Sequence, residues 1–210
     1  MRNALKFLLT LVAATVLMLV VRAFVFAVYT VDGASLAPLF HVGDRVVVNR
    51  WGYGLRVGGG DTVDYTRWLR RPIGRNELVA FNYPLGKACQ VEDREVYICV
   101  CTAVPGDTVR QQGMYFVMPG KRVPVNVTSA NMRLLCYIYN KYEPQMAAIR
   151  QHKLYVDGQE TMRAYFTRDY YWMSSGNPKN CNDSRFFGPV PESYVIGSVV
   201  AVLPALFTQH

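Results

Sequence analysis

The N-terminal apolar stretch constrains the fold most, because it is too long and too uncharged to be an ordinary surface segment. Residues 5–21 carry one charge, Lys6, and apolar residues continue past Arg22 through Val28. As a helix, about 17 residues at roughly 1.5 Å each cover about 26 Å, slightly short of a typical hydrocarbon core. An arginine near a helix end can snorkel to the interface. The sequence therefore predicts a transmembrane anchor over residues 1–28.

A cleaved signal peptide is the alternative interpretation of this stretch. Such a peptide has a shorter apolar run and a small-x-small cleavage site, whereas "AFVFAVYTVDG" offers no convincing site of that kind. Arg2 and Lys6 precede the span, which predicts a cytoplasmic N-terminus. Arg22 on the far side weakens this orientation. We therefore expect a single-pass membrane protein whose remaining residues lie outside the cytoplasm.

The rest of the chain, residues 29–210, has the pattern of an antiparallel, mostly β domain. Strand-like runs alternate with turn signals in "GDRVVVNRWGYGL", "NELVAFNYP" and "KLYVDGQET", the last with an Asp-Gly turn between its flanks. Residues 121–152 have a mixed composition and are interpreted as an inserted excursion, in which "NMRLLCYIYNKY" is assigned to neither helix nor strand. The expected fold class is mainly β, with one β domain behind one N-terminal transmembrane helix.

Composition limits the classes of partner and cofactor. The net charge is +8, and the densest basic run is "RWLRRPIGR". We interpret this run as a solvated or membrane-facing loop near anionic lipid, and we expect no nucleic-acid partner. The five cysteines form no CxxC pair and no histidine spacing typical of zinc, so we expect no metal and no other cofactor.

The stretch "EVYICVCTAVPGD", residues 95–107, is a strand with two chemically different faces. On an extended chain, alternate side chains point in opposite directions, so Tyr97, Cys99, Cys101 and Ala103 share one face. A Pro-Gly-Asp turn ends the strand. Reactive side chains on one strand face indicate a candidate catalytic strand.

Four stretches carry a specific combination of motifs. They read "VDGASLAPLFHVGDRVVVNRWGYGL", "RNELVAFNYP", "YICVCTAVPGD" and "YYWMSSGNPKNCNDSRFFGPVPESYVIGSV". In this order, and behind an N-terminal anchor, they resemble the type I signal peptidase family of membrane-anchored serine endopeptidases, which remove signal peptides. The resemblance covers both ends of the chain and leaves roughly residues 121–152 unmatched.

The resemblance implies a serine nucleophile and a lysine general base, and the base is missing. Ser35 falls at the nucleophile position. Aligned on the Pro-Gly-Asp turn, the family's lysine position is Cys99, and a thiol is a poor replacement for a desolvated amine. The serine that orients the lysine falls on Cys181, and the serine that helps to hold the oxyanion falls on Gly33.

The resemblance also implies that an ion pair has been lost as a whole, since its aspartate falls on Gly176 and its arginine on Val100. Loss of both partners is structurally tolerable, whereas loss of one leaves an unmatched charge. No disulfide between Cys99 and Cys181 is expected. The family's long lysine reaches its serine from afar, whereas the Cβ atoms of a disulfide lie within about 3.5–4.5 Å.

Four residues are candidates for a displaced base. Lys87 precedes the strand, Lys179 lies in the fourth stretch, His41 follows the nucleophile turn, and His152 lies in the excursion. Each fits a solvated side chain better than a base, because a lysine base requires desolvation.

The leading hypothesis is a signal-peptidase-like protein of the export pathway that is proteolytically inactive or strongly weakened. Its expected partners are signal peptides or exported preproteins, the lipid bilayer and an active signal peptidase paralogue. The alternative is an active signal peptidase I that uses Ser35 and a displaced base. A third hypothesis, a Ser–Lys self-cleaving repressor with a related β fold, is disfavoured by the anchor and by the absence of a helix-turn-helix.

Overall fold

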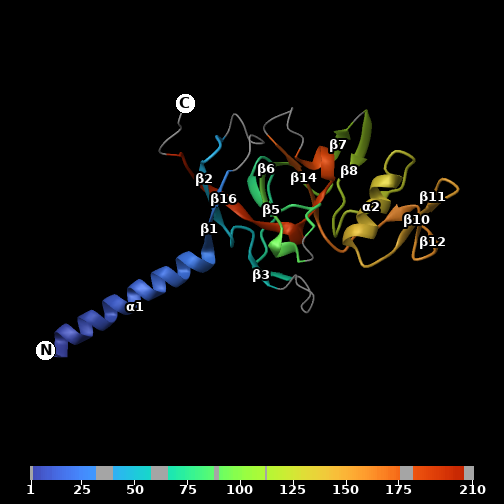
Figure 1. Cartoon of the computed structure of the whole chain (residues 1–210). Coiled ribbons are helices and arrows are strands. Elements are labelled where there is room, and N and C mark those ends of the chain that lie inside the picture. Colours follow the sequence, from blue (N-terminus) through green and yellow to red (C-terminus); the bar gives the residue numbers. More distant parts are fainter. Residues whose placement is uncertain are drawn as a thin grey trace.

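The chain combines a long N-terminal helix with a β domain (Figure 1). The computed structural model describes residues 2–31, 40–57, 66–87, 90–111, 113–175 and 182–205, of which 2–5 and 20–24 are described by their backbone alone. Most of the regular elements are antiparallel strands. The expectation of a mainly β fold is therefore confirmed.

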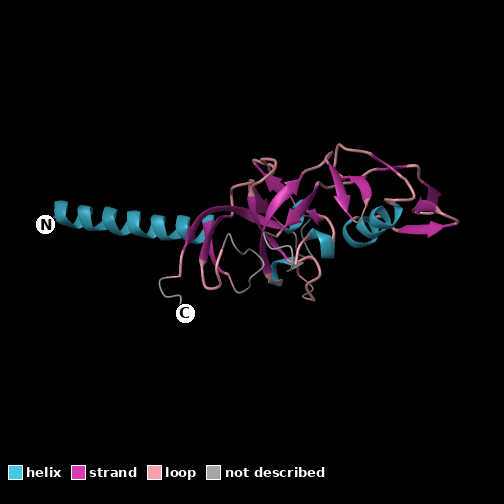
Figure 2. Ribbon diagram, turned by 90° about the horizontal axis from the view of Figure 1, so that it is seen from above, coloured by secondary structure: helices cyan, strands magenta, loops and turns pink. Residues whose placement is uncertain are grey.

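Helix α1 (Arg2–Val25) has 24 residues and extends away from the β domain in two perpendicular views (Figures 1 and 2). Its described side chains include many large, exposed apolar groups, such as Phe7, Leu11 and Leu17. Among the described residues, no helix combines the length and the apolarity needed to cross a membrane. Strand β1 (Phe26–Thr30) follows α1 directly and pairs with its neighbour, so residues 26–28, which were expected within the anchor segment, form part of the β domain.

An antiparallel sheet of seven strands forms the centre of the β domain, in the order β1-β2-β16-β5-β6-β14-β15. Besides β1, its strands are β2 (Arg45–Asn49), β5 (Leu78–Asn82), β6 (Val96–Ala103), β14 (Tyr170–Ser174), β15 (Val190–Pro191) and β16 (Val195–Leu203). The last strand, β16, pairs with both β2 and β5 and so joins the first strands of the domain to its middle. Strand β6 lies inside the sheet, between β5 and β14.

Alternate side chains of β5 and β6 fill two different hydrophobic cores. Val79, Phe81, Cys99 and Cys101 belong to the larger core, whereas Ala80 and Ile98 belong to the smaller one. This is the alternation expected of a strand buried on both faces. The two faces predicted for residues 96–103 are thus confirmed.

Smaller elements surround the central sheet. They are the paired strands β3 (Leu55–Val57) with β4 (Thr66–Trp68), β7 (Thr108–Gln111) with β8 (Met114–Val117), and β9 (Val125–Asn126) with β13 (Arg163–Ala164), a sheet of β10 (Ala147–Arg150), β11 (Lys153–Val156) and β12 (Gln159–Glu160), the helices α2 (Met132–Tyr142) and α3 (Ser184–Phe187), and the 3₁₀ turns η2 (Val91–Asp93) and η3 (Glu192–Tyr194). Figure 1 shows α2 and β10–β12 together at the end of the β domain that is remote from α1.

The excursion at residues 121–152 contains a helix that the sequence did not assign. Helix α2 has one buried face, formed by Met132, Leu135, Ile138, Tyr139 and Tyr142. Their spacing is that of an amphipathic helix. The ring of Tyr142 lies 6.0 Å from that of Tyr170 on β14 and 5.6 Å from that of Tyr194. The excursion therefore shares the larger core of the β domain.

Two predicted turns have the expected geometry. Asp157 and Gly158, between β11 and β12, both have positive φ, at 49° and 83°. Such values are typical of the type I′ turn that Asp-Gly favours. Gly106 of the Pro-Gly-Asp turn has φ 93° and lies three residues after the end of β6. Both turns are therefore fixed by local sequence.

Two adjacent phenylalanines provide a matched test of the larger core. Phe187 is 2% exposed and contacts the rings of Phe81 and Tyr83 edge-on, whereas Phe186 is 63% exposed. We expect Phe187→Ala to lower the free energy of unfolding by about 3–5 kcal/mol, because it leaves a cavity. Phe186→Ala should change it by no more than about 0.5 kcal/mol. Denaturant unfolding of the two variants measures both values, and equal losses would contradict the described packing.

Candidate active site

The central strand β6 carries Cys99, the residue at the position of the expected general base. Cys99 lies opposite Val79 of β5 and is 1% exposed. Cys101, two residues further along the same face, is fully buried. Both are free thiols within the larger core. The strand therefore presents Cys99 to the interior of the protein and not to solvent.

Burial decides the chemical state of the Cys99 thiol. Desolvation, together with the negative charge of Asp183, raises the pKa of Cys99 to about 12. A thiol with this pKa is almost entirely protonated at neutral pH, and the thiolate is the reactive form. Burial therefore disfavours the thiolate form of Cys99 at neutral pH.

Asp183 is the fully buried carboxylate whose charge acts on Cys99. It caps the N-terminus of α3 by accepting a hydrogen bond from the Arg185 backbone N–H at 2.9 Å. It also accepts from the Arg185 guanidinium at 3.0 Å and from the Ser175 N–H and hydroxyl at 3.0 and 3.1 Å. The carboxylate is therefore held by donors from both sides of residues 176–181.

The same donors keep Asp183 ionised. Burial alone would raise the pKa of Asp183, but the hydrogen bonds from Arg185 and Ser175 outweigh it and lower the pKa below its usual value. Ser184, next to it, accepts a hydrogen bond from the Met173 N–H at 2.9 Å. The Asp-Ser-Arg motif thus ties α3 to β14 and fixes a negative charge near Cys99.

The other site residues expected from the sequence lie outside the described residues. These are Ser35 at the nucleophile position, Gly33 at the oxyanion position, Cys181 at the orienting serine, and Gly176 of the lost ion pair. Four replacements concern the family's lysine, its orienting serine and the two partners of the ion pair. Of these four, only Cys99 and Val100 lie among the described residues, both on β6.

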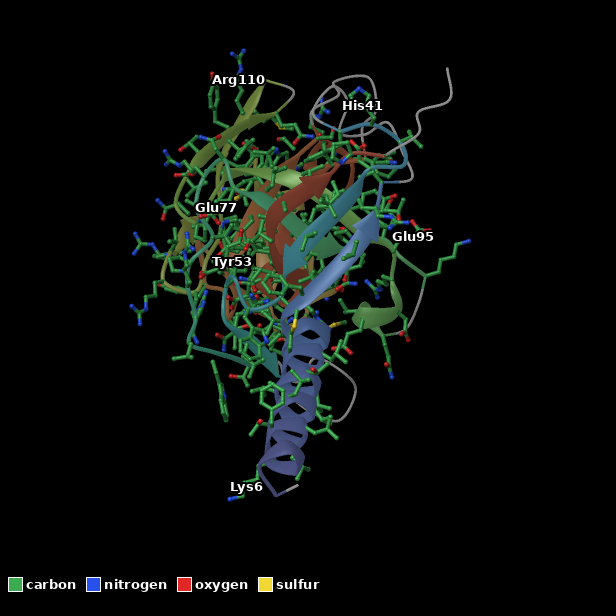
Figure 3. All side chains as sticks on the ribbon, turned by 90° about the vertical axis from the view of Figure 1, so that its left-hand side faces the viewer. Lys6, His41, Tyr53, Glu77, Glu95 and Arg110 are labelled. Atoms are coloured by element: carbon green, nitrogen blue, oxygen red, sulfur yellow. The ribbon has the colours of Figure 1, made fainter. Side chains whose placement is uncertain are left out.

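Three of the four candidates for a displaced base are described, and all three are exposed. Lys87 lies in the loop after β5, and His152 lies in the turn between β10 and β11. The side chain of His41 is 76% exposed, with Nδ1 3.9 Å from an Asp44 oxygen. Figure 3 shows His41 at the periphery of the β domain. Lys179 lies outside the described residues.

Sequence reasoning missed the role of Asp183 in the environment of Cys99. The motif that contains Asp183 was recognised as a family signature, but the two residues are far apart in sequence. Their proximity depends on the pairing of β14 with β6. Within the described part of the chain, no group of three His, Cys, Asp or Glu side chains could hold a metal ion.

We predict that Cys99 resists alkylation in the folded protein, because its thiol is both buried and protonated. Treatment with iodoacetamide at pH 7.5, followed by peptide mass spectrometry, measures modification at each cysteine. Cys99 and Cys101 should stay unmodified in buffer and become fully modified in guanidinium chloride. Rapid modification of Cys99 in the folded protein would contradict the described site.

We predict that Asp183→Asn destabilises the protein at pH 7. The pKa of Asp183 is lowered in the folded state, so its ionised form stabilises the fold above the unfolded pKa of about 3.9. That contribution is lost as the pH falls through the lower, folded-state pKa. The loss caused by Asp183→Asn should therefore shrink below about pH 4.

Denaturant unfolding between pH 3 and pH 7 measures this difference, with the exposed Asp93→Asn as the matched control. The control should differ little from the parent at any pH. A loss for Asp183→Asn that is constant across this range would show that the carboxylate charge contributes nothing.

Comparison with known proteins gives one consistent result. The chain is similar to signal peptidase I of Pseudomonas fluorescens, with 26% identity over 89% of this chain and 67% of that protein. Signal peptidase I of Pseudomonas aeruginosa matches to the same extent, at 26% over 89% and 67%. Signal peptidase I S of Bacillus subtilis is 30% identical over 63% of this chain and 59% of its own length. The family model for signal peptidase, peptidase S26, matches residues 4–204. The chain therefore belongs to the signal peptidase family of the S26 peptidases.

Proposed function

We propose that this protein is a membrane-anchored member of the signal peptidase family whose proteolytic activity is lost or strongly weakened. One observation carries the proposal: the residue aligned with the family's lysine base is Cys99, a thiol that is 1% exposed. Signal peptides of exported preproteins are the substrates that the family implies. In our proposal the protein binds such chains, or an active signal peptidase, without cleaving.

The thiol cannot take over the role of the amine, because burial acts on the two groups in opposite directions. Desolvation lowers the pKa of a lysine and so populates the neutral amine, which can accept a proton from serine. Desolvation raises the pKa of a cysteine and so removes the thiolate. The raised pKa of Cys99, about 12, is therefore the reverse of what a base at this position requires.

The exposure of the described alternatives also supports the loss of activity. Lys87, His41 and His152 are exposed to solvent, whereas a lysine base requires desolvation. The alignment adds two replacements, Gly33 for the oxyanion serine and Cys181 for the orienting serine. A general base contributes about 10²–10⁴-fold to a rate, and an oxyanion donor contributes about 10²–10³-fold. Their joint absence predicts a rate lower by on the order of 10⁴-fold or more.

The side chains that stabilise the fold are present, although the residues at the catalytic positions are replaced. Asp183, Ser175 and Arg185 form a connected hydrogen-bond network. The Pro-Gly-Asp turn is closed by Asp107, which accepts from the Val104 N–H at 2.9 Å and from Arg75 Nε at 2.7 Å. A preserved scaffold can still bind an extended peptide by strand addition, because that mode needs backbone groups and pockets but no catalyst.

We further propose that α1 anchors the protein in the membrane, with the N-terminus in the cytoplasm and the β domain outside. The described side chains of residues 6–19 are exposed throughout, and Lys6 is their only charge. A helix of 24 residues is about 36 Å long, and a hydrocarbon core is about 30 Å thick. Arg2 and Lys6 at its start favour the cytoplasmic orientation.

A cleavage assay on the purified full-length protein tests the proposed loss of activity. The substrate is a preprotein with a small-x-small signal peptide, and signal peptidase I of Pseudomonas aeruginosa serves as the positive control. We expect cleavage at least about 10⁴-fold slower than that of the control, and no change in Ser35→Ala.

Cys99→Lys should also show no cleavage, because the serines that hold the oxyanion and orient the lysine remain replaced. Cleavage by the parent protein that disappears in Ser35→Ala would contradict the proposal. That result would establish the alternative, an active signal peptidase with a displaced base.

A further inference from the structure

A cleft in the β domain is lined only by polar and charged side chains within the described part of the chain. Its volume is about 340 Å³, and its lining combines Arg67, Arg70, Lys121 and Arg168 with Glu192 and two threonines. We call this space the basic cleft. Ligand pockets have volumes from about 300 Å³ upward and are usually lined by apolar side chains. The basic cleft has the volume of such a pocket without the apolar lining, which suits a small and strongly polar ligand.

Separate segments of the chain meet at the basic cleft. Arg67 lies on β4 and Arg70 follows that strand, and both belong to the basic run "RWLRRPIGR". Lys121 lies between β8 and β9, Arg168 precedes β14, and Glu192 begins η3. The fold therefore adds two distant cations to two arginines of that run, an arrangement that no local sequence pattern predicts.

Arg70 is the cation of the cleft that is already matched by acids. Its guanidinium pairs with the Glu192 carboxylate at 2.7 Å and with the Asp169 carboxylate. Asp169 also accepts a hydrogen bond from the Lys121 backbone N–H at 2.9 Å. These contacts hold Arg70 and the backbone of Lys121 in place, and they engage both carboxylates.

Lys121 and Arg168 form no ion pair within the described part of the chain. The Arg168 guanidinium donates a hydrogen bond to the hydroxyl of buried Ser193 at 3.3 Å, which is a neutral partner. Lys121 is exposed at the cleft. The described lining thus contains two positive charges that no carboxylate contacts.

One further carboxylate lies near the basic cleft. Glu143 accepts hydrogen bonds from the Thr167 N–H and hydroxyl at 3.1 and 2.6 Å, and from the Tyr170 hydroxyl at 2.6 Å. Its oxygens are therefore engaged by neutral donors. Asp61 and Asp64 precede β4 and lie outside the described residues. For that reason we rest the inference on the two cations that are remote from β4 in sequence.

The surplus of positive charge favours an anion as the ligand. A cleft lined by one sign of charge concentrates ligands of the opposite sign. The guanidinium of arginine donates paired hydrogen bonds to phosphate oxygens, and the ammonium of lysine binds the same oxygens as a compact charge. A phosphate group can therefore bind between Lys121 and Arg168 while the ion pairs of Arg70 stay intact.

A smaller cavity adjoins the basic cleft. It shares Arg67, Arg70 and Glu192 with the cleft and has a volume of about 10 Å³. Tyr53 lines it and is 1% exposed, and its hydroxyl has no hydrogen-bond partner among the described residues. Burial, together with the nearby Glu77, raises the pKa of Tyr53, so the hydroxyl keeps its proton and can donate it. Buried hydroxyls normally have a partner, and a volume of about 10–15 Å³ holds one water molecule. This volume suits one water between Tyr53 and a ligand in the cleft.

We propose that the basic cleft binds the phosphate group of a small, polar phosphorylated molecule, with Lys121 and Arg168 as its principal contacts. The proposal is independent of the proposed loss of peptidase activity and of the proposed anchor, because the lining includes neither Cys99 nor any residue of α1. A lipid head group carries the same phosphate chemistry. The described lining has no apolar side chain for an acyl chain, so we commit to a soluble ligand.

Isothermal titration calorimetry on the purified full-length protein in a non-ionic detergent tests the proposal. The probes are inorganic phosphate and glycerol 3-phosphate, and vesicles of phosphatidylglycerol provide the lipid arm. We expect saturable binding of one phosphate per chain. The double variant K121Q/R168Q should raise the Kd at least about tenfold, because it removes two charged donors.

The matched control is R133Q/R150Q, which removes two positive charges from exposed residues of α2 and β10. It has the same net charge as K121Q/R168Q and should bind phosphate like the parent. Thermal unfolding separates binding from a structural role. Phosphate should raise the unfolding midpoint of the parent and of the control but not that of K121Q/R168Q. Lys121→Gln alone changes an exposed residue and should weaken binding by a smaller factor, even where the double variant folds poorly.

Each remaining outcome would overturn the proposal. The absence of both heat and stabilisation at millimolar phosphate would show that the cleft binds no phosphate. Equal weakening in the two double variants would show only long-range attraction by the net charge. Unchanged binding in K121Q/R168Q with a lower midpoint in the absence of phosphate would assign the two cations a structural role. Binding to phosphatidylglycerol vesicles alone, lost in K121Q/R168Q, would assign the cleft to a lipid head group.

Discussion

The buried carboxylate of Asp183 is the interaction on which the rest of the site depends. A buried charge is stable only when donors surround it, and Asp183 receives them from Ser175 and from Arg185. Ser175 follows β14 and Arg185 belongs to α3, so the carboxylate links these two elements. It also caps α3 and adds a negative charge to the surroundings of Cys99. Asp183 therefore both stabilises the start of α3 and adds a negative charge near β6.

Under the proposed loss of the base, this constraint accounts for a fold that does not depend on a lysine at the position of Cys99. A lysine in the core must lose its hydration, which is costly, whereas a cysteine packs as a small hydrophobic residue. Cys99 is in the larger core beside Val79, and the charge of Asp183 is already balanced by Arg185. Replacement of the lysine therefore leaves no unpaired charge behind. The fold remains stable because the side chains that stabilise it are not the side chains that catalysis requires.

Sequence reasoning succeeded where local rules determine the structure. The two faces of β6, the Asp-Gly turn and the Pro-Gly-Asp turn follow from alternation and turn chemistry alone. Helix α2 was left unassigned, because its polar and aromatic residues favour no single element until Tyr142 packs against β14. The proximity of Asp183 to Cys99 depends on strand pairing over a long sequence separation. No local pattern encodes it.

In our proposal, β6 presents a buried thiol at the position of the family's base, so the β domain binds without cleaving. We propose that no side chain of the protein activates Ser35. The most direct test is the rate at which a serine-reactive phosphonofluoridate modifies Ser35 in the purified full-length protein, followed by intact mass. We predict no adduct at Ser35 in the parent protein, the same result as in Ser35→Ala. A stoichiometric adduct on Ser35 that is absent in Ser35→Ala would contradict it.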